Sequence, residues 1–93
     1  MDFVILGAGS IGTRHIASLE ALDQRVAAVA DPDLSNSLVQ TKHGSVRSYS
    51  DPGECLQSEA KDRAVVIASP SKFHGAQALA AIDNGCSALL IEK

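Results

Sequence analysis

Aromatic residues are scarce in this chain, which has no tryptophan, one tyrosine and two phenylalanines among 93 residues. Hydrophobic residues nevertheless make up 45% of the sequence, a proportion typical of globular proteins. We therefore expect a core of aliphatic side chains. The short length allows one domain at most, with a modest core.

Other absences exclude whole classes of protein. No apolar run approaches the roughly 20 residues that span a bilayer, and the N-terminus lacks the basic segment and cleavage pattern of a signal peptide. The eight basic residues are scattered and the net charge is −3, so we expect no nucleic-acid partner. Cys55 and Cys86 are too few for a disulfide scaffold. No His, Cys, Asp or Glu grouping has metal-ligand spacing. These features favour a cytoplasmic protein with free thiols, no metal and no membrane partner.

Four short apolar runs predict buried strands, at residues 3–6, 26–30, 64–68 and 88–91. None of them alternates apolar with polar residues, which is typical of strands buried on both faces of a parallel sheet. A polar, brief run at residues 46–49 predicts a weaker edge strand.

Helical patterns separate these strands. One follows Gly9 and continues to Leu22. A short helix opens at Asp51-Pro52, with aspartate as N-cap and proline in the first turn. A further helix carries apolar residues at every third position over residues 73–82, and Asn84-Gly85 ends it.

A helix is also predicted between residues 33 and 43. Leu34, Leu38 and Val39 mark its apolar face, Asp33 is its expected N-cap, and Gly44 follows its end. Strands and helices then alternate strictly, which predicts right-handed crossovers and an α/β fold. We expect a Rossmann-type, doubly wound parallel sheet of about five strands in the order 3-2-1-4-5, with helices on both faces. The complete pattern normally has a sixth strand, and we expect residues 1–93 to end before it.

The hexapeptide GAGSIG at residues 7–12 follows the first strand and opens the first helix, as a dinucleotide-binding fingerprint requires. Gly7 makes the tight turn, Gly9 lets a pyrophosphate approach the backbone, and Gly12 lets the helix pack closely on the sheet. The free N–H groups of the helix N-terminus would hold the phosphate charge. We therefore expect Gly7, Gly9, Ser10, Ile11 and Gly12 to bind a dinucleotide.

Asp31 lies 19 positions after Gly12 and directly follows the second predicted strand. A carboxylate there can accept hydrogen bonds from both adenosine ribose hydroxyls and would repel a 2′-phosphate. No arginine follows it, so the sequence favours NAD over NADP as cofactor. The alternative is that Asp31 is only a turn residue, as Asp33 is expected to be a capping residue.

Over residues 1–93 the sequence resembles the N-terminal domain of the glucose-fructose oxidoreductase, inositol dehydrogenase and MocA (Gfo/Idh/MocA) family. Four features carry the resemblance: the glycine loop continuing into residues 13–19, with its His15 and Leu19; the segment ADPD at residues 30–33; the segment SPSKFH at residues 69–74, similar to the family's Thr-Pro-Asn-x-x-His; and Glu92-Lys93, where the family has Glu-Lys-Pro. Ser71 departs from the family pattern, which more often has asparagine or proline there.

The resemblance implies roles for five further residues. Ser69, Pro70 and His74 would line the cofactor cleft, and Glu92 would lie near the nicotinamide ribose. Lys93 would be the catalytic lysine that orients the substrate hydroxyl and assists its proton transfer. The family's second domain, which brings most of the substrate contacts, is absent from residues 1–93, so these residues are expected to form the dinucleotide-binding domain alone.

The resemblance also implies a function: hydride transfer between a nicotinamide cofactor and a sugar, polyol or related hydroxy substrate. These 93 residues would bind the cofactor but would not turn over substrate alone. Two alternatives remain open, a stand-alone nucleotide-binding sensor or accessory module without catalysis, and a site for another adenosine ligand such as S-adenosylmethionine. An uncovered sheet edge would also favour self-association.

Overall fold

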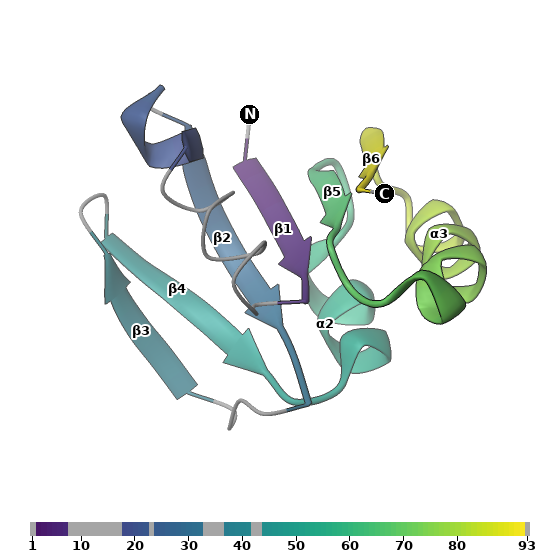
Figure 1. Cartoon of the computed structure of the whole chain (residues 1–93). Helices are drawn as coiled ribbons and strands as arrows, with labels where there is room; N and C mark the ends of the chain where they lie inside the picture. The colour runs from purple at the N-terminus through teal and green to yellow at the C-terminus, as the bar shows by residue number, and fades with distance from the viewer. Residues whose placement is uncertain (1, 8–17, 23, 33–36, 42–43, 93) are drawn as a thin grey trace.

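The computed structural model describes residues 2–7, 18–22, 24–32, 37–41 and 44–92 of the chain. A six-stranded sheet in the order β3-β4-β2-β1-β5-β6 forms its centre (Figure 1). The strands are β1 (Asp2–Leu6), β2 (Arg25–Ala30), β3 (Ser37–Thr41), β4 (Gly44–Tyr49), β5 (Ala64–Ile67) and β6 (Ala88–Ile91). The helices are α2 (Pro52–Glu59) and α3 (His74–Asp83), with a 3₁₀ turn at Ser71–Phe73; residues 18–21 are also helical.

Five of the strands are parallel and follow the predicted order. Counted along the chain without β3, the parallel strands β4-β2-β1-β5-β6 have the order 3-2-1-4-5. Leu6 of β1 is in register with Ala30 of β2 and with Ile67 of β5. The carboxyl ends of the three central strands therefore meet at one edge of the sheet, which confirms the predicted doubly wound fold.

The helix predicted between residues 33 and 43 is wrong where the structure describes this segment. Ser37–Thr41 form β3, which pairs antiparallel with β4, Val39 opposite Val46 and Thr41 opposite Gly44. Val39 and Thr41 are β-branched and favour an extended backbone. A short helix gains little on its own, whereas a strand here satisfies the backbone groups that β4 would otherwise expose. The run at 46–49 is therefore not an edge strand: β4 is longer than expected and lies between β2 and β3.

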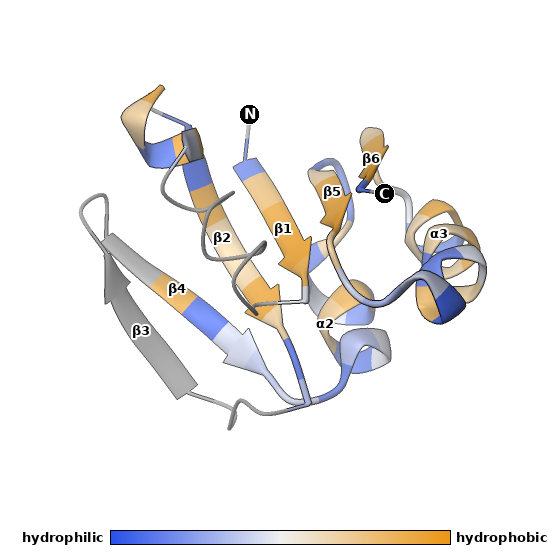
Figure 2. Cartoon of the chain, viewed as in Figure 1, coloured by the Kyte–Doolittle hydropathy of each residue, from blue (hydrophilic) through white to orange (hydrophobic). Residues whose placement is uncertain are grey.

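The core has two parts, one on each face of the sheet, because successive strand residues point to opposite faces. Val4 and Leu6 of β1 pack with Leu56 of α2 and Ala81 of α3. On the other face Ile5 belongs to a second cluster, against which Leu19 of the helical residues 18–21 packs. Helices thus cover both faces, and Figure 2 shows the apolar character of the central strands.

The local signals at the helix ends act as the sequence predicts. The Asp51 carboxylate accepts a hydrogen bond of 3.2 Å from Gly53 N, and Pro52 is the first residue of α2. After α3, Gly85 has a φ of 81°, a left-handed conformation that favours glycine beyond a helix end. In the described ranges, no helix has the length and apolar character to cross a membrane.

A buried carboxylate ties α2 to the sheet. Glu59 is 4% exposed, and its carboxylate accepts hydrogen bonds from the Tyr49 hydroxyl (2.6 Å), Arg63 Nη1 (2.7 Å) and Arg47 Nη1 (3.2 Å). Burying a carboxylate is costly unless partners compensate for its lost hydration. These three partners supply that compensation and attach the end of α2 to β4 and to Arg63, just before β5.

Candidate functional site

A pocket lies at the carboxyl edge of the sheet, where β1 is flanked by β2 on one side and β5 on the other. Chain connections leave in opposite directions at such a point, which opens a crevice for ligands in parallel α/β sheets. The pocket has a volume of about 440 Å³. Its lining residues come from the ends of β1, β2 and β5, from the start of α2, and from the 3₁₀ turn and α3: Gly7, Ala30, Asp31, Pro32, Pro52, Ser69, Pro70, Phe73 and Gln77.

Gly7 forms the back of this pocket and leaves no room for a side chain. Its φ is +93°, its N–H donates to the carbonyl of Ala30 (2.6 Å), and a Cβ there would lie 2.6 Å from the nitrogen of Ser69. A side chain is therefore excluded both by the backbone conformation and by the neighbouring turn. This geometry matches the tight turn that the sequence assigns to Gly7.

The turn at Ser69-Pro70 is held by two residues of α3. The Ser69 hydroxyl donates a hydrogen bond to Oε1 of Gln77. Nε2 of His74 lies 2.6 Å from the carbonyl oxygen of Ser69. Because a carbonyl can only accept, Nε2 carries the proton of this bond. His74 is not among the pocket-lining residues; it holds the turn in place from outside the pocket.

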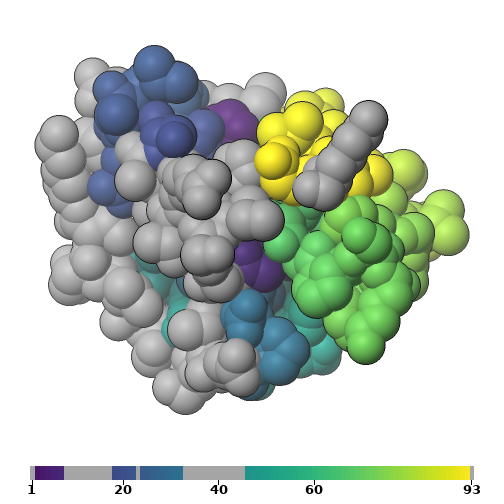
Figure 3. All heavy atoms as spheres, in the orientation of Figure 1, coloured from purple at the N-terminus to yellow at the C-terminus, as the bar shows by residue number. Residues whose placement is uncertain are grey.

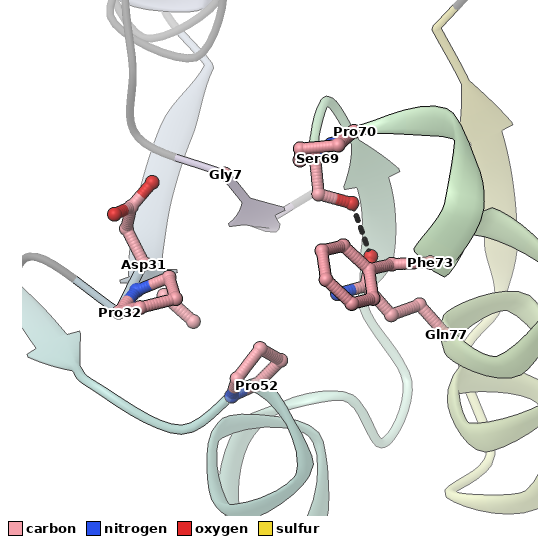
Figure 4. Close-up of a pocket in the computed structure, with 9 residues that line it drawn as sticks. Gly7, Asp31, Pro32, Pro52, Ser69, Pro70, Phe73 and Gln77 are labelled. Carbon is pink, nitrogen blue, oxygen red and sulfur yellow. Dashed lines mark hydrogen bonds between the residues drawn. The ribbon is translucent and has the colours of Figure 1, made fainter.

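Asp31 lies across the pocket from Ser69. It follows β2, and its N–H donates to the carbonyl of Tyr49 (2.9 Å), which extends the pairing of β2 with β4 by one bond. Figure 4 shows Asp31 and Pro32 on one side of the pocket, Ser69, Phe73 and Gln77 on the other, and Pro52 below them. A ligand in the pocket would therefore contact a carboxylate on one wall and a serine and an amide on the opposite wall.

Glu92 stands apart from the pocket. It follows β6, and its N–H donates to the carbonyl of Ile67 (2.9 Å), so it lies at the same sheet edge beside the end of β5. The remaining predicted site residues Gly9, Ser10, Ile11, Gly12 and Lys93 lie outside the described residues. Their proposed contacts with cofactor and substrate stay predictions.

Sequence reasoning missed most of the apolar wall. Phe73 was expected on the core face of a helix, but it lies in the 3₁₀ turn before α3 and is 44% exposed at the pocket. Gln77, four residues later, lies on the same side of the helical segment. The sequence offered only their position as a signal: both residues come soon after β5, whose carboxyl end lies at the edge of the sheet where ligands bind. Pro32 and Pro52 likewise follow β2 and β4.

The pocket walls are mostly apolar, with a few polar groups. In the part of the chain that the structure describes, no three His, Cys, Asp or Glu side chains gather as metal ligands. The walls combine proline and phenylalanine rings with a few polar groups, a composition typical of sites for small organic ligands. A flat heterocycle joined to a hydroxylated sugar fits this combination.

A comparison with family models gives a match over the whole chain. Residues 1–93 match the Gfo/Idh/MocA model, described as an oxidoreductase family with an NAD-binding Rossmann fold. The chain belongs to this family. It is therefore an NAD-binding Rossmann domain of the Gfo/Idh/MocA type, as the motifs at residues 7–12, 69–74 and 92–93 indicate. A search among curated proteins gives no match.

Solved structures show the same fold at low sequence identity. The WlbA dehydrogenase from Bordetella pertussis, solved with NADH and UDP-GlcNAcA, is 22% identical with a TM-score of 0.73 over 98% of this chain. The scyllo-inositol dehydrogenase from Lactobacillus casei, solved with NAD(H) and scyllo-inositol, is 20% identical with a TM-score of 0.76 over 100% of the chain. A Rex-family repressor is 12% identical with a TM-score of 0.77 over 99% of it. The chain spans 28% of each dehydrogenase and 44% of the repressor.

Proposed function

We propose that this chain is the cofactor-binding domain of an NAD-dependent oxidoreductase acting on a sugar, polyol or related hydroxy compound. The observation that carries the proposal is that Gly7, Asp31 and the Ser69-Pro70 turn line the same pocket, at the edge where the central strands end. The chain covers only 28% of dehydrogenases with this fold. We therefore assign substrate binding and turnover to a protein in which a substrate domain accompanies these residues.

In the proposed binding mode the chain positions the cofactor from several sides. The Asp31 carboxylate accepts hydrogen bonds from the adenosine ribose hydroxyls, and the rings of Pro32, Pro52 and Phe73 exclude water around the base. The predicted roles of residues 7–12 at the pyrophosphate, Glu92 near the nicotinamide ribose and Lys93 at the substrate hydroxyl complete the mode. The nicotinamide, when bound, supplies the hydride acceptor or donor.

NAD is the proposed cofactor rather than NADP. A 2′-phosphate would place additional negative charge beside the Asp31 carboxylate, and the next residue along the chain is Pro32, which offers no positive charge. Isothermal titration calorimetry with NAD, NADP and S-adenosylmethionine tests this choice. We expect measurable binding of NAD, weaker binding of NADP and no binding of S-adenosylmethionine.

The decisive variant is Asp31→Ala. It removes the ribose contact and the repulsion of a 2′-phosphate together, so NAD affinity should fall about tenfold or more while NADP binding weakens less. Asp83→Ala, at the end of α3 and outside the pocket lining, is the matched control and should change neither affinity. Tighter binding of NADP than NAD by the unmodified chain would refute the cofactor assignment. No binding of either dinucleotide would refute the proposed function.

A second candidate is a nucleotide-binding sensor or accessory module, and the likeness to the Rex-family repressor favours it. The reading frame that encodes Lys93 distinguishes the two proposals. A following substrate domain of about 200 residues supports the oxidoreductase, since cofactor domains of this kind are paired with a second domain. A DNA-binding or other non-catalytic partner domain in the same frame would support the sensor.

A further inference from the structure

We propose that Gln77 recognises the base of the bound dinucleotide and makes the site selective for adenine, with Ser69 positioning its amide. The inference rests on the proposed function, because it concerns the same pocket. It adds a specificity-determining residue on α3 that none of the sequence motifs contains.

One part of the pocket, among the residues that the structure describes, suits a base. Asp31, on the wall formed by the end of β2, is the group that suits ribose hydroxyls. The space beyond it is bounded by the rings of Pro32, Pro52 and Phe73, and the opposite wall carries Gln77 (Figure 4). A volume of about 440 Å³ accommodates a nucleoside-sized ligand. A flat ring between these apolar side chains would direct its polar edge towards the amide.

The amide of Gln77 has unused hydrogen-bonding capacity. A carboxamide offers two lone pairs on oxygen and two N–H donors on nitrogen. Oε1 accepts one bond from the Ser69 hydroxyl, which is the hydrogen bond that the structure records for this side chain. Towards the rest of the described residues, one lone pair and both N–H groups remain to serve a ligand in the pocket.

Adenine presents the pattern that this amide complements. Its exocyclic amino group is a donor adjacent to a ring-nitrogen acceptor, and glutamine pairs with such an edge by accepting one hydrogen bond and donating another. Hypoxanthine carries a carbonyl oxygen in place of the amino group. If the Gln77 amide keeps the same orientation, the hypoxanthine oxygen would face Oε1. Both atoms are hydrogen-bond acceptors, so they would repel each other.

Ser69 is the positioning residue because it fixes the amide orientation. With Oε1 directed to the Ser69 hydroxyl, the nitrogen of the amide is left for the ligand. Ser69 itself is held through its carbonyl by His74 (2.6 Å) and packs against Gly7. The Gln77 amide is thus held, through Ser69, against the turn at Gly7 that follows β1. Its conformation is largely fixed before a ligand binds, so little conformational entropy is lost on binding.

The experiment compares two dinucleotides that differ only in the base: NAD and nicotinamide hypoxanthine dinucleotide. Their affinities for the full chain are measured by calorimetry. We expect the unmodified chain to prefer NAD about tenfold, the discrimination that one well-aligned bidentate contact supplies. Gln77→Met has similar size but neither donor nor acceptor, and it should reduce the preference to about twofold or less. Ser69→Ala removes the hydrogen bond that orients the Gln77 amide and allows the amide to rotate by about 180°. This variant should therefore show an intermediate preference for NAD.

Gln57→Met is the matched control, since Gln57 is exposed on α2 and does not line the pocket. It should leave both affinities unchanged. Circular dichroism reports whether each variant folds, and Gln77→Glu provides a second probe. Glutamate keeps an acceptor for Ser69 and an acceptor towards the ligand, which would still oppose the hypoxanthine oxygen, so this variant should retain a preference for adenine.

The outcomes separate this inference from the proposed function. Loss of the base preference in Gln77→Met, with the preference kept in Gln77→Glu and Gln57→Met, supports the inference. Binding of NAD with an unchanged base preference in Gln77→Met overturns it, and leaves Gln77 as a residue that only attaches α3 to the turn. That result would leave the proposed function intact, whereas failure of the unmodified chain to bind either dinucleotide removes both.

Discussion

The backbone of Gly7 packs directly against that of Ser69: a Cβ on Gly7 would lie 2.6 Å from Ser69 N and 2.8 Å from Ser69 Cα. Two segments that are 62 positions apart in the sequence, residues 7 and 69, thus form one continuous wall of the pocket (Figure 4). The wall exists because β1 and β5 are adjacent parallel strands that end in register, Leu6 opposite Ile67. A change at Gly7 must therefore disturb both the fold and the site.

Gly7→Ala should destabilise the domain by about 2–4 kcal/mol, since it combines a left-handed φ with a steric overlap against backbone atoms. Gly75→Ala is the contrasting control. Gly75 lies in α3 with no neighbouring atom within 4 Å of an added Cβ, so the change should stabilise by roughly 0.5–1 kcal/mol. Urea denaturation followed by circular dichroism measures both. Equal free energies of unfolding for the two variants would contradict the assigned close approach.

Glu59→Gln should cost about 2–4 kcal/mol of unfolding free energy, because it removes the charge that compensates Arg63 and Arg47 and leaves a buried polar group with mismatched partners. Glu54→Gln, an exposed change in the first turn of the same helix, should cost less than about 0.5 kcal/mol. Chemical denaturation of the two variants under identical conditions makes the comparison. A small effect at Glu59 would show that its three hydrogen bonds contribute little to stability.

The two free thiols should react very differently. Cys55 is buried, and burial, followed by the nearby negative charge of Glu59, raises the pKa of its thiol to about 12. Only the thiolate is nucleophilic, so iodoacetamide at pH 8 should modify Cys86, which is partly exposed, and leave Cys55 unmodified until the protein unfolds. Mass spectrometry of peptides from native and urea-treated samples counts the modified sites. Rapid alkylation of Cys55 in the native protein would contradict the burial described here.

Alkaline pH should lower stability. The raised pKa of Cys55 means that the unfolded chain releases its thiol proton near the ordinary value of 9.0, while the folded chain retains it up to about 12. Between these values the folded state binds more protons, so the free energy of unfolding decreases as pH rises. The pKa of Tyr49 is raised in the same direction, chiefly by burial. Denaturation curves from pH 7 to 11 should show this decline, and Cys55→Ala should flatten it.

The apolar side chains on α3 and β6 should promote self-association. Leu79 and Ile82 of α3 and Leu90 and Ile91 of β6 are 43–65% exposed, and the two elements lie next to each other at one end of the molecule (Figures 1 and 3). Exposed apolar surface beside a sheet edge favours association. Sedimentation velocity over a wide concentration range should detect dimers or larger species. The double variant Ile82→Glu/Leu90→Lys should shift the chain towards monomer, and a monomeric unmodified chain would refute the expectation.

Much of the fold could be predicted because it depends on local patterns and on general rules of chain topology. Apolar runs such as Val65-Val66-Ile67, short and rich in β-branched residues, are typical of a buried strand, and right-handed crossovers then limit the strand order. The prediction was wrong for Ser37–Thr41, which form a strand and not part of a helix. The strand preference of Val39 and Thr41 is weak beside the helical pattern, so the available edge of β4 decided the structure of the segment, and no local pattern reports that edge.

The candidate site divides in the same way. Gly7, Asp31 and Ser69-Pro70 could be selected from the sequence because each directly follows a strand at the ligand edge, where topology alone brings them close. Phe73 and Gln77 could not, since a helical pattern does not say which of its residues turn towards a pocket. Their place at the pocket depends on how α3 packs against β5, which only tertiary contacts define.

The sequence by itself determined the alternation of strands and helices, the parallel order and the family to which the chain belongs, because each is encoded in residues close together along the chain. Only the tertiary structure decided that β3 replaces a helix and that Gln77 meets Ser69 across the pocket from Asp31. These outcomes depend on competition between distant segments for the same backbone groups and the same space. The strength of such interactions is fixed by packing and not by local pattern.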